Sequence, residues 1–134
     1  MKAVVDTNVV AYFLLGTDAC VDESRAALEA LSNPVAPVHW EAELANVVWM
    51  AIRAGVLSAE EGPARLGLAR RLGIESVATG TLCQGALLRA VTSGVPVYDT
   101  LFVELAARLG CPLLTFDRAV LRAFPAIAKR PRDF

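Results

Sequence analysis

The chain has 134 residues with a formal net charge of −1, and this balance excludes a strongly basic protein that coats nucleic acid. Hydrophobic residues make up 55% of the chain, which favours either a buried sheet covered on both faces or an apolar surface kept for a partner. No apolar run approaches the roughly 18 to 20 residues of a membrane-spanning helix, and Asp6 and Asn8 interrupt any signal-peptide core, so we expect a cytoplasmic protein with no membrane segment.

The first half of the chain alternates short apolar runs with helical patterns. In chain order these patterns predict a strand over residues 2–5, helices over 9–15 and 22–31, a strand over 35–38 and a helix over 40–53. Asp6 directly follows the first strand. Pro34 and Pro37 weaken the second strand, because proline cannot donate a backbone hydrogen bond.

The second half continues the alternation of helices and strands. The patterns predict a helix from Ser58 to about 72, a strand over 74–78, helices over 79–91 and 99–109, a strand over 112–116, a helix over 117–124 and a short edge strand at 127–128. Ser58, with Glu61 three residues later, is typical of a capping box. Strands that alternate with helices indicate a mostly parallel sheet in a three-layer α/β/α sandwich, and the absence of a linker indicates a single domain over residues 1–134.

The three cysteines are odd in number and scattered. Cys20, Cys83 and Cys111 form no C-x-x-C pair, which argues against a disulfide framework and against a thiolate metal site. We therefore expect three small buried apolar residues in a reducing compartment.

Four acidic residues are placed where a ligand site could form. Asp6 and Asp117 each stand where an apolar strand passes into a helix, and in open α/β sheets ligands bind at that edge. Glu43 and Asp99 lie near the N-terminal ends of their predicted helices, so all four could converge on one rim. Each acid by itself is also explained as a helix cap or as a first-turn residue.

Convergence would have a definite chemical consequence. Four carboxylates held close together repel one another, so either some hold protons or a cation lies among them. Mg²⁺ prefers oxygen ligands and retains waters, which suits carboxylates combined with a substrate phosphate. Such an ion can activate a water for attack on a phosphodiester. The only histidine, His39, and the scattered cysteines offer no zinc site.

Four short stretches resemble the PIN-domain family, specifically the VapC-type toxins of bacterial toxin–antitoxin pairs. In order they are VVDTNV at 4–9, ELANV at 43–47, YDTLFVELA at 98–106 and LTFDR at 114–118. Each is short and weakly specific by itself, but their order matches the family pattern over nearly the whole chain.

The resemblance implies a function and a set of site residues. It implies an endoribonuclease that needs Mg²⁺ or Mn²⁺, forms a homodimer and is blocked by a small cognate antitoxin protein. It implies that the catalytic, metal-holding acids are Asp6, Glu43, Asp99 and Asp117. It also implies that Asn8 and Thr115 support them, although ordinary turn hydrogen bonding explains both residue types equally well.

Two other acids lie close to this set in the sequence. Glu41 is two residues before Glu43, and at that helical spacing only one of the two can face the site. Glu43 is the better choice because Asn46-Val47 follows it as the family pattern expects, which leaves Glu41 solvated. Glu104 we expect to be a solvated or peripheral charge.

Basic and aromatic residues are candidates for binding partners. Arg118, beside Asp117, is the first candidate for contacts to RNA phosphates, followed by Arg89, Arg122 and the basic tail over 129–132. Surface solvation is the other interpretation of each one. A further set of apolar residues could form a dimer face or an antitoxin groove, although core packing explains most of them: Phe13, Leu14, Trp40 and Trp49.

Three alternatives to a ribonuclease remain open. In a phosphoaspartate domain of the HAD or receiver type Asp6 would be the nucleophile, but such domains also use a lysine from the middle or later part of the chain, and only Lys2 and Lys129 exist here. A catalytically silent PIN-like module that only binds a partner would have no physical need for four carboxylates at one rim. DNA is an alternative substrate because a carboxylate–metal site does not itself require a 2′-hydroxyl.

Overall fold

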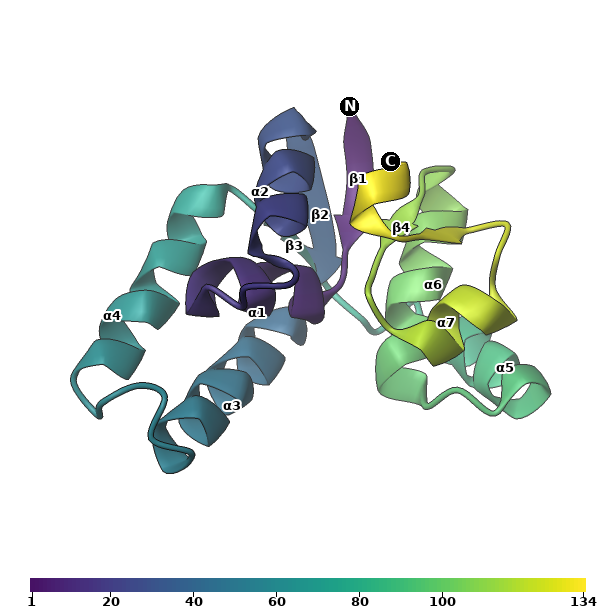
Figure 1. Ribbon diagram of the computed structural model, residues 1–134. Helices are drawn as coiled ribbons and strands as arrows, with labels where there is room; N and C mark the ends of the chain where they lie inside the picture. Colours follow the sequence, from purple (N-terminus) through teal and green to yellow (C-terminus); the bar gives the residue numbers. More distant parts are fainter.

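A five-stranded parallel sheet forms the centre of the molecule (Figure 1). The computed structural model describes all residues from Met1 to Phe134. In the order β3-β2-β1-β4-β5, every neighbouring pair of strands is parallel. The strands are β1 Lys2–Val5, β2 Asn33–Pro37, β3 Glu75–Val77, β4 Leu113–Leu114 and β5 Ala128–Lys129.

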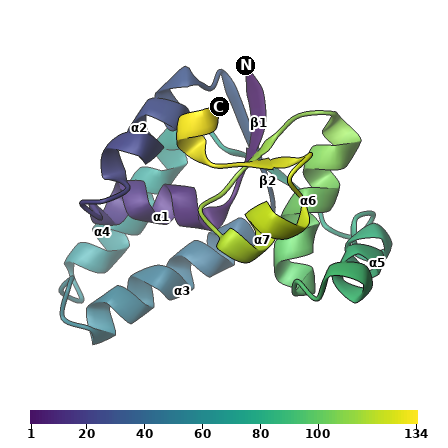
Figure 2. The ribbon, with the colours of Figure 1, turned by 45° about the vertical axis from the view of Figure 1, so that its right-hand side comes forward.

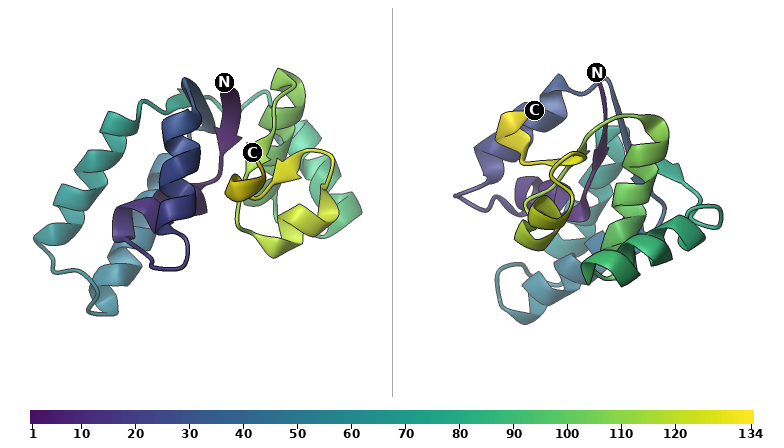
Figure 3. Two further views of the ribbon diagram at one scale, coloured as in Figure 1. Left: turned by 45° about the horizontal axis from the view of Figure 1, so that its top comes forward. Right: turned by 90° about the vertical axis from the view of Figure 1, so that its right-hand side faces the viewer.

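Helices cover both faces of this sheet. They are α1 Thr7–Leu15, α2 Val21–Ala30, α3 Trp40–Arg53, α4 Glu61–Leu68, η1 Ala69–Leu72, α5 Cys83–Ser93, α6 Val97–Leu109, α7 Arg118–Ala123 and η2 Pro131–Asp133. Helices α1 to α4 lie on one side of the strands, and α5 and α6 lie on the other (Figures 1 and 3). The predicted three-layer α/β/α sandwich with a parallel sheet is therefore confirmed.

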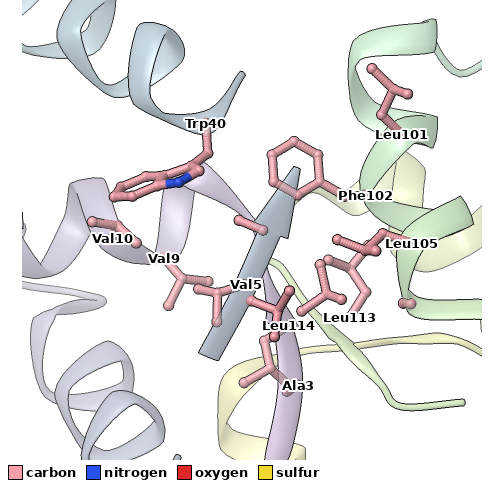
Figure 4. Packing of buried hydrophobic residues seen from close by; sticks show 14 of the residues in the cluster. Ala3, Val5, Val9, Val10, Trp40, Leu101, Phe102, Leu105, Leu113 and Leu114 are labelled. Carbon is pink, nitrogen blue, oxygen red and sulfur yellow. The ribbon is translucent and has the colours of Figure 1, made fainter. Parts of the chain in front are cut away.

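The core lies on both faces of the short central strands. Figure 4 shows Val10 and Trp40 on one side of Val5, with Phe102 and Leu105 on the other. All five are buried members of one cluster of 26 residues. A strand buried on both faces reads as an unbroken apolar run, and this is why the run over residues 2–5 stood out in the sequence.

The second predicted strand is stronger than its prolines suggested. β2 pairs with β1 on one side and with β3 on the other, so it lies inside the sheet. A proline loses only its donor and keeps its carbonyl acceptor. The ladder also continues past Pro37, since the Val38 amide donates to the Val77 carbonyl at 2.7 Å.

The predicted capping box is confirmed. The Ser58 hydroxyl accepts from the Glu61 amide at 2.9 Å, and the Glu61 carboxylate accepts from the Ser58 amide at 3.0 Å. The helix itself begins at Glu61 and continues into the 3₁₀ turn η1.

The expected burial of the cysteines was wrong. All three cysteines are free, as expected, but none is buried, since Cys83 is exposed at the start of α5 and Cys20 and Cys111 are half-buried. Among the aromatic candidates, Trp40 is in the core and Trp49 is exposed.

The C-terminal segment returns to the first part of the chain. Figure 2 shows the segment after β5 passing back toward α2, with the two termini near one another. Arg130 forms an ion pair with Glu23 of α2 at 2.9 Å and lies over the Phe116 ring. None of the helices is long and apolar enough to cross a membrane.

Candidate active site

The strand order reverses between β1 and β4. From β1 the sheet grows to β2 and β3 on one side, while β4 and β5 lie on the other. At such a reversal the connections leave in opposite directions and open a crevice at the carboxyl ends of the strands. Asp6 directly follows β1, and Thr115 and Asp117 follow β4, so these residues lie at the carboxyl ends of two neighbouring strands beside the reversal, the place called the crevice below.

The tertiary structure brings the four predicted acids together. The charges of Asp99 and Glu43 act on Asp6, and those of Asp117 and Glu43 act on Asp99. Asp99 therefore interacts with each of the other three acids. This meeting at one edge is the convergence that sequence spacing left open.

The electrostatic strain is concentrated on Asp6 and Asp99. Burial raises the pKa of Asp6 to about 7, with a further increase from the charges of Asp99 and Glu43, although the hydrogen bond from Thr115 opposes both. Burial also raises the pKa of Asp99, and the charges of Asp117 and Glu43 raise it further. Both carboxylates are thus held in surroundings that disfavour their charge.

Thr115 connects the two sides of the crevice. Its hydroxyl is buried, donates to Asp6 Oδ2 at 2.7 Å and accepts from the Asp117 amide at 3.0 Å. Asn8 Nδ2 donates to the same hydroxyl at 3.3 Å, and Asn8 Oδ1 accepts from the Phe116 amide at 3.2 Å. Asn8 and Thr115 therefore lie where the resemblance placed them, and they join the segment after β1 to the segment after β4.

The alternative interpretation of these acids as helix caps holds for one of them. Asp117 Oδ1 accepts from the amides of Ala119 and Val120, at 2.8 and 3.2 Å, and so caps α7. Its other oxygen has no hydrogen-bond partner within the protein. Asp6 precedes α1 in the cap position but makes no side-chain cap bond, so helix capping does not account for Asp6.

The two glutamates at the start of α3 diverge. Glu43 accepts a hydrogen bond from the Thr7 hydroxyl at 2.8 Å and faces the cluster of acids. Glu41 instead accepts from the Ser76 hydroxyl at 2.9 Å and is exposed. Only one of the pair faces the crevice, as the helical spacing predicted.

Two residues at the crevice were missed by the sequence analysis. Thr7 holds Glu43, and the signal for it was its position directly after Asp6. His39 lies one helical turn before Glu43, with its Nε2 3.7 Å from Glu43 Oε1 and 2.9 Å from the Tyr98 carbonyl oxygen. The spacing of four residues in a predicted helix could have indicated that His39 and Glu43 share a face.

Two expectations about charged residues were wrong. Glu104 was expected to be a solvated or peripheral charge, but it is not solvated: only 9% of it is exposed, and its carboxylate pairs with Arg89 at 2.9 Å and with Arg108 at 2.7 Å. Burial works to raise the pKa of Glu104, but the hydrogen bonds from the two arginines outweigh it and lower the pKa. Arg89 is therefore not a free candidate for phosphate. Arg118 is exposed and forms no ion pair.

The donor set of the crevice suits a hard cation. Apart from His39, no basic side chain is paired with any of the four acids, whereas Glu23 and Glu104 are each paired with arginine. Carboxylate oxygens that lack a counter-charge are the ligands that Mg²⁺ and Mn²⁺ accept. In this structure no three histidine, cysteine or acidic side chains lie close enough together to hold a metal ion.

Comparison with known proteins identifies the family. The model of the PIN domain family matches residues 3–127. Ribonuclease VapC3 of Pyrobaculum aerophilum is 30% identical over 131 residues, which cover 95% of this chain and 98% of that protein. Ribonuclease VapC3 of Mycobacterium tuberculosis is 32% identical over 125 residues, which cover 93% of this chain and 89% of that protein.

A solved structure described as a toxin–antitoxin complex from Klebsiella pneumoniae contains a chain of the same fold. Its TM-score is 0.64 at 17% identity, and the match covers 96% of this chain and 97% of that one. The family match covers most of the length of the chain, and the related ribonucleases cover nearly all of it. The chain therefore belongs to the PIN domain family and is of the VapC type.

Proposed function

We propose that this chain is a divalent-metal-dependent endoribonuclease and the toxin of a type II toxin–antitoxin pair. The observation that carries the proposal is the meeting of Asp6, Glu43, Asp99 and Asp117 at the reversal of strand order, without an arginine or lysine to balance them. The names of the related ribonucleases point to the same reaction.

In this proposal the four acids hold Mg²⁺ or Mn²⁺. Asp6 and Asp99 gain most from the ion, because the attraction of a nearby cation opposes the burial and the carboxylate repulsion that raise their pKa values. When bound, the ion supplies an activated water and neutralises charge that develops on the phosphodiester.

The remaining residues position this acidic set. Thr115 and Asn8 hold the Asp6 carboxylate through hydrogen bonds of 2.7 and 3.4 Å, and Thr7 holds Glu43. The acids by themselves would repel the phosphates of RNA. Arg118, one residue after Asp117 and exposed, would supply a compensating positive charge for the backbone of the substrate.

A cleavage assay on paired variants tests the proposal. Purified protein is incubated with a labelled structured RNA and, in parallel, a single-stranded DNA, with Mg²⁺, with Mn²⁺ or with EDTA. Glu43→Gln is expected to lower RNA cleavage by orders of magnitude. The matched control is Glu41→Gln, two residues earlier on the same helix, which is expected to retain cleavage.

The results discriminate among the alternatives. Activity that survives EDTA or the Glu43→Gln change would contradict the metal site. A wild-type chain that binds its partner but cuts neither nucleic acid would indicate a silent PIN-like module. Cleavage of DNA in preference to RNA would overturn the substrate class.

The proposal also includes protein partners, namely a cognate small antitoxin and a second copy of the chain. Exposed apolar side chains leave surface for both, in one group around the end of α3 (Trp49, Met50 and Val56) and another along α5 (Leu87, Leu88 and Val91). Light scattering of the purified chain measures the homodimer. Co-expression with a small neighbouring reading frame, followed by affinity purification, tests the antitoxin.

A further inference from the structure

His39 joins two of the helices that carry acids. It is the residue before α3, and its Nε2 lies 2.9 Å from the Tyr98 carbonyl oxygen in α6. Because a carbonyl can only accept, Nε2 carries the proton and donates it. No other hydrogen bond or ion pair connects residues 39–53 with residues 97–109.

The position of this hydrogen bond is specific. The Tyr98 carbonyl belongs to the peptide group that leads directly into Asp99. On the other side, His39 is one helical turn before Glu43, and Nε2 is 3.7 Å from Glu43 Oε1. The His39 imidazole therefore links the start of α3, which carries Glu43, to the peptide group that precedes Asp99 in α6.

Packing alone does not account for a histidine here. The ring lies against Phe102, with 4.9 Å between centroids, which an apolar side chain would also achieve. Histidine at this position leaves its second nitrogen, Nδ1, buried with no hydrogen-bond partner. A buried polar atom without a partner destabilises a fold, so the donor on Nε2 is what distinguishes histidine from phenylalanine or leucine.

We propose that His39 is a positioning residue, which holds Asp99 at the correct place relative to Glu43 by donating from Nε2 to the Tyr98 carbonyl. Thr7 also holds Glu43, by a hydrogen bond of 2.8 Å to the same oxygen, Oε1, that lies near His39. His39 thus acts through the two acids and need not contact the substrate. Its catalytic consequence rests on the function proposed above.

The test compares side chains with and without the donor. His39→Gln presents an amide N–H group near the place of the imidazole Nε2, whereas His39→Phe keeps the ring contact with Phe102 and removes the donor. His39→Leu is a second variant without a donor, in case phenylalanine does not fit. Each is measured for Tm, for Mn²⁺ affinity by calorimetry on the metal-free protein, and for kcat and KM on a labelled RNA.

The donor is expected to matter for metal affinity and kcat. His39→Phe and His39→Leu are expected to bind Mn²⁺ about 10-fold or more weakly, as for other residues that orient metal ligands. They are also expected to lower kcat at unchanged KM and to keep the wild-type Tm. His39→Gln is expected to restore Mn²⁺ affinity to within about 3-fold of wild type, on the same scale of effects.

Three results would overturn the proposal. The first is wild-type Mn²⁺ affinity in both variants without a donor. The second is a folded His39→Gln variant whose Mn²⁺ affinity stays as low as that of the variants without a donor. The third is a loss of Tm in the variants without a donor that parallels their loss of Mn²⁺ affinity, because the role of His39 would then be structural. If the wild-type chain neither binds Mn²⁺ nor cuts RNA, the proposed function itself fails. If only the positioning role of His39 fails, the wild-type chain still binds Mn²⁺ and cuts RNA, so the two failures are distinguishable.

Discussion

Replacing Asp6 by asparagine is expected to stabilise the metal-free protein. The Asp6 carboxyl is buried beside Asp99 and Glu43, and its pKa is raised from an ordinary 3.8 to about 7, first by burial and then by those charges. A difference of that size corresponds to about 4 kcal/mol of preference for the neutral form. Asparagine is neutral at every pH and can still accept the hydrogen bond from Thr115.

The expected gain in the free energy of unfolding is smaller than the about 4 kcal/mol by which the site prefers a neutral group. The amide of asparagine brings an N–H₂ group that must find acceptors in the same crevice. We therefore expect Asp6→Asn to raise the free energy of unfolding at pH 8 in EDTA by about 1 to 3 kcal/mol. For a chain of this size that is a Tm increase of roughly 3 to 10 °C.

The effect has a definite dependence on pH. Because the folded state binds the Asp6 proton more tightly than the unfolded state, the wild-type free energy of unfolding falls as pH rises from about 4 to about 7. At pH 5 the carboxyl is protonated in the folded state but already largely ionised in the unfolded state, so part of the loss is present and the difference between wild type and variant should be less than half of that at pH 8. At pH 8 the full difference should be present.

Urea denaturation in EDTA at pH 5 and pH 8 measures this difference. Asp18→Asn is the matched control, because Asp18 is exposed and forms no hydrogen bond or ion pair, and it should change nothing at either pH. Addition of Mn²⁺ at pH 8 should stabilise wild type more than Asp6→Asn. The electrostatic account of this site would be refuted if Asp6→Asn were less stable than wild type at pH 8, or if its gain in stability over wild type were the same at pH 5 and pH 8.

Three further predictions follow from other contacts. Asp117→Ala removes the cap of α7 and should lower the free energy of unfolding by about 1 kcal/mol in urea denaturation, whereas Asp117→Asn should keep the cap and the stability. Both variants should lose RNA cleavage. Gly85→Ala would place a Cβ 2.5 Å from the Glu104 carboxyl group and should cost about 1 to 3 kcal/mol by urea denaturation, while Gly67→Ala, in open space on α4, should stabilise by about 0.5 kcal/mol. Arg118→Gln should raise KM for RNA and reduce the slope of log affinity against log salt by about 1, and an unchanged salt slope would remove Arg118 from the binding surface.

Local patterns in the sequence determined the elements of the fold. The apolar run over 2–5 is a strand because both of its faces are covered, and β-branched side chains suit that position. The helix over 40–53 was predicted at the bounds that it has, since its apolar spacing repeats over several turns. Ser58 and Glu61 form their capping box within one turn, and so needed no distant partner.

The tertiary structure decided everything that depends on distant residues meeting. The sequence placed Asp6 and Asp117 at strand ends, but only the reversal of strand order between β1 and β4 puts those ends side by side. The burial of Glu104 was not foreseen because one of its two arginine partners, Arg89, lies on a different helix, whereas Arg108 is on the same one. His39 gains its role from the Tyr98 carbonyl, 59 residues away. Periodicity is a property of neighbours along the chain, whereas charge balance and hydrogen bonding at this crevice depend on how separate elements pack together.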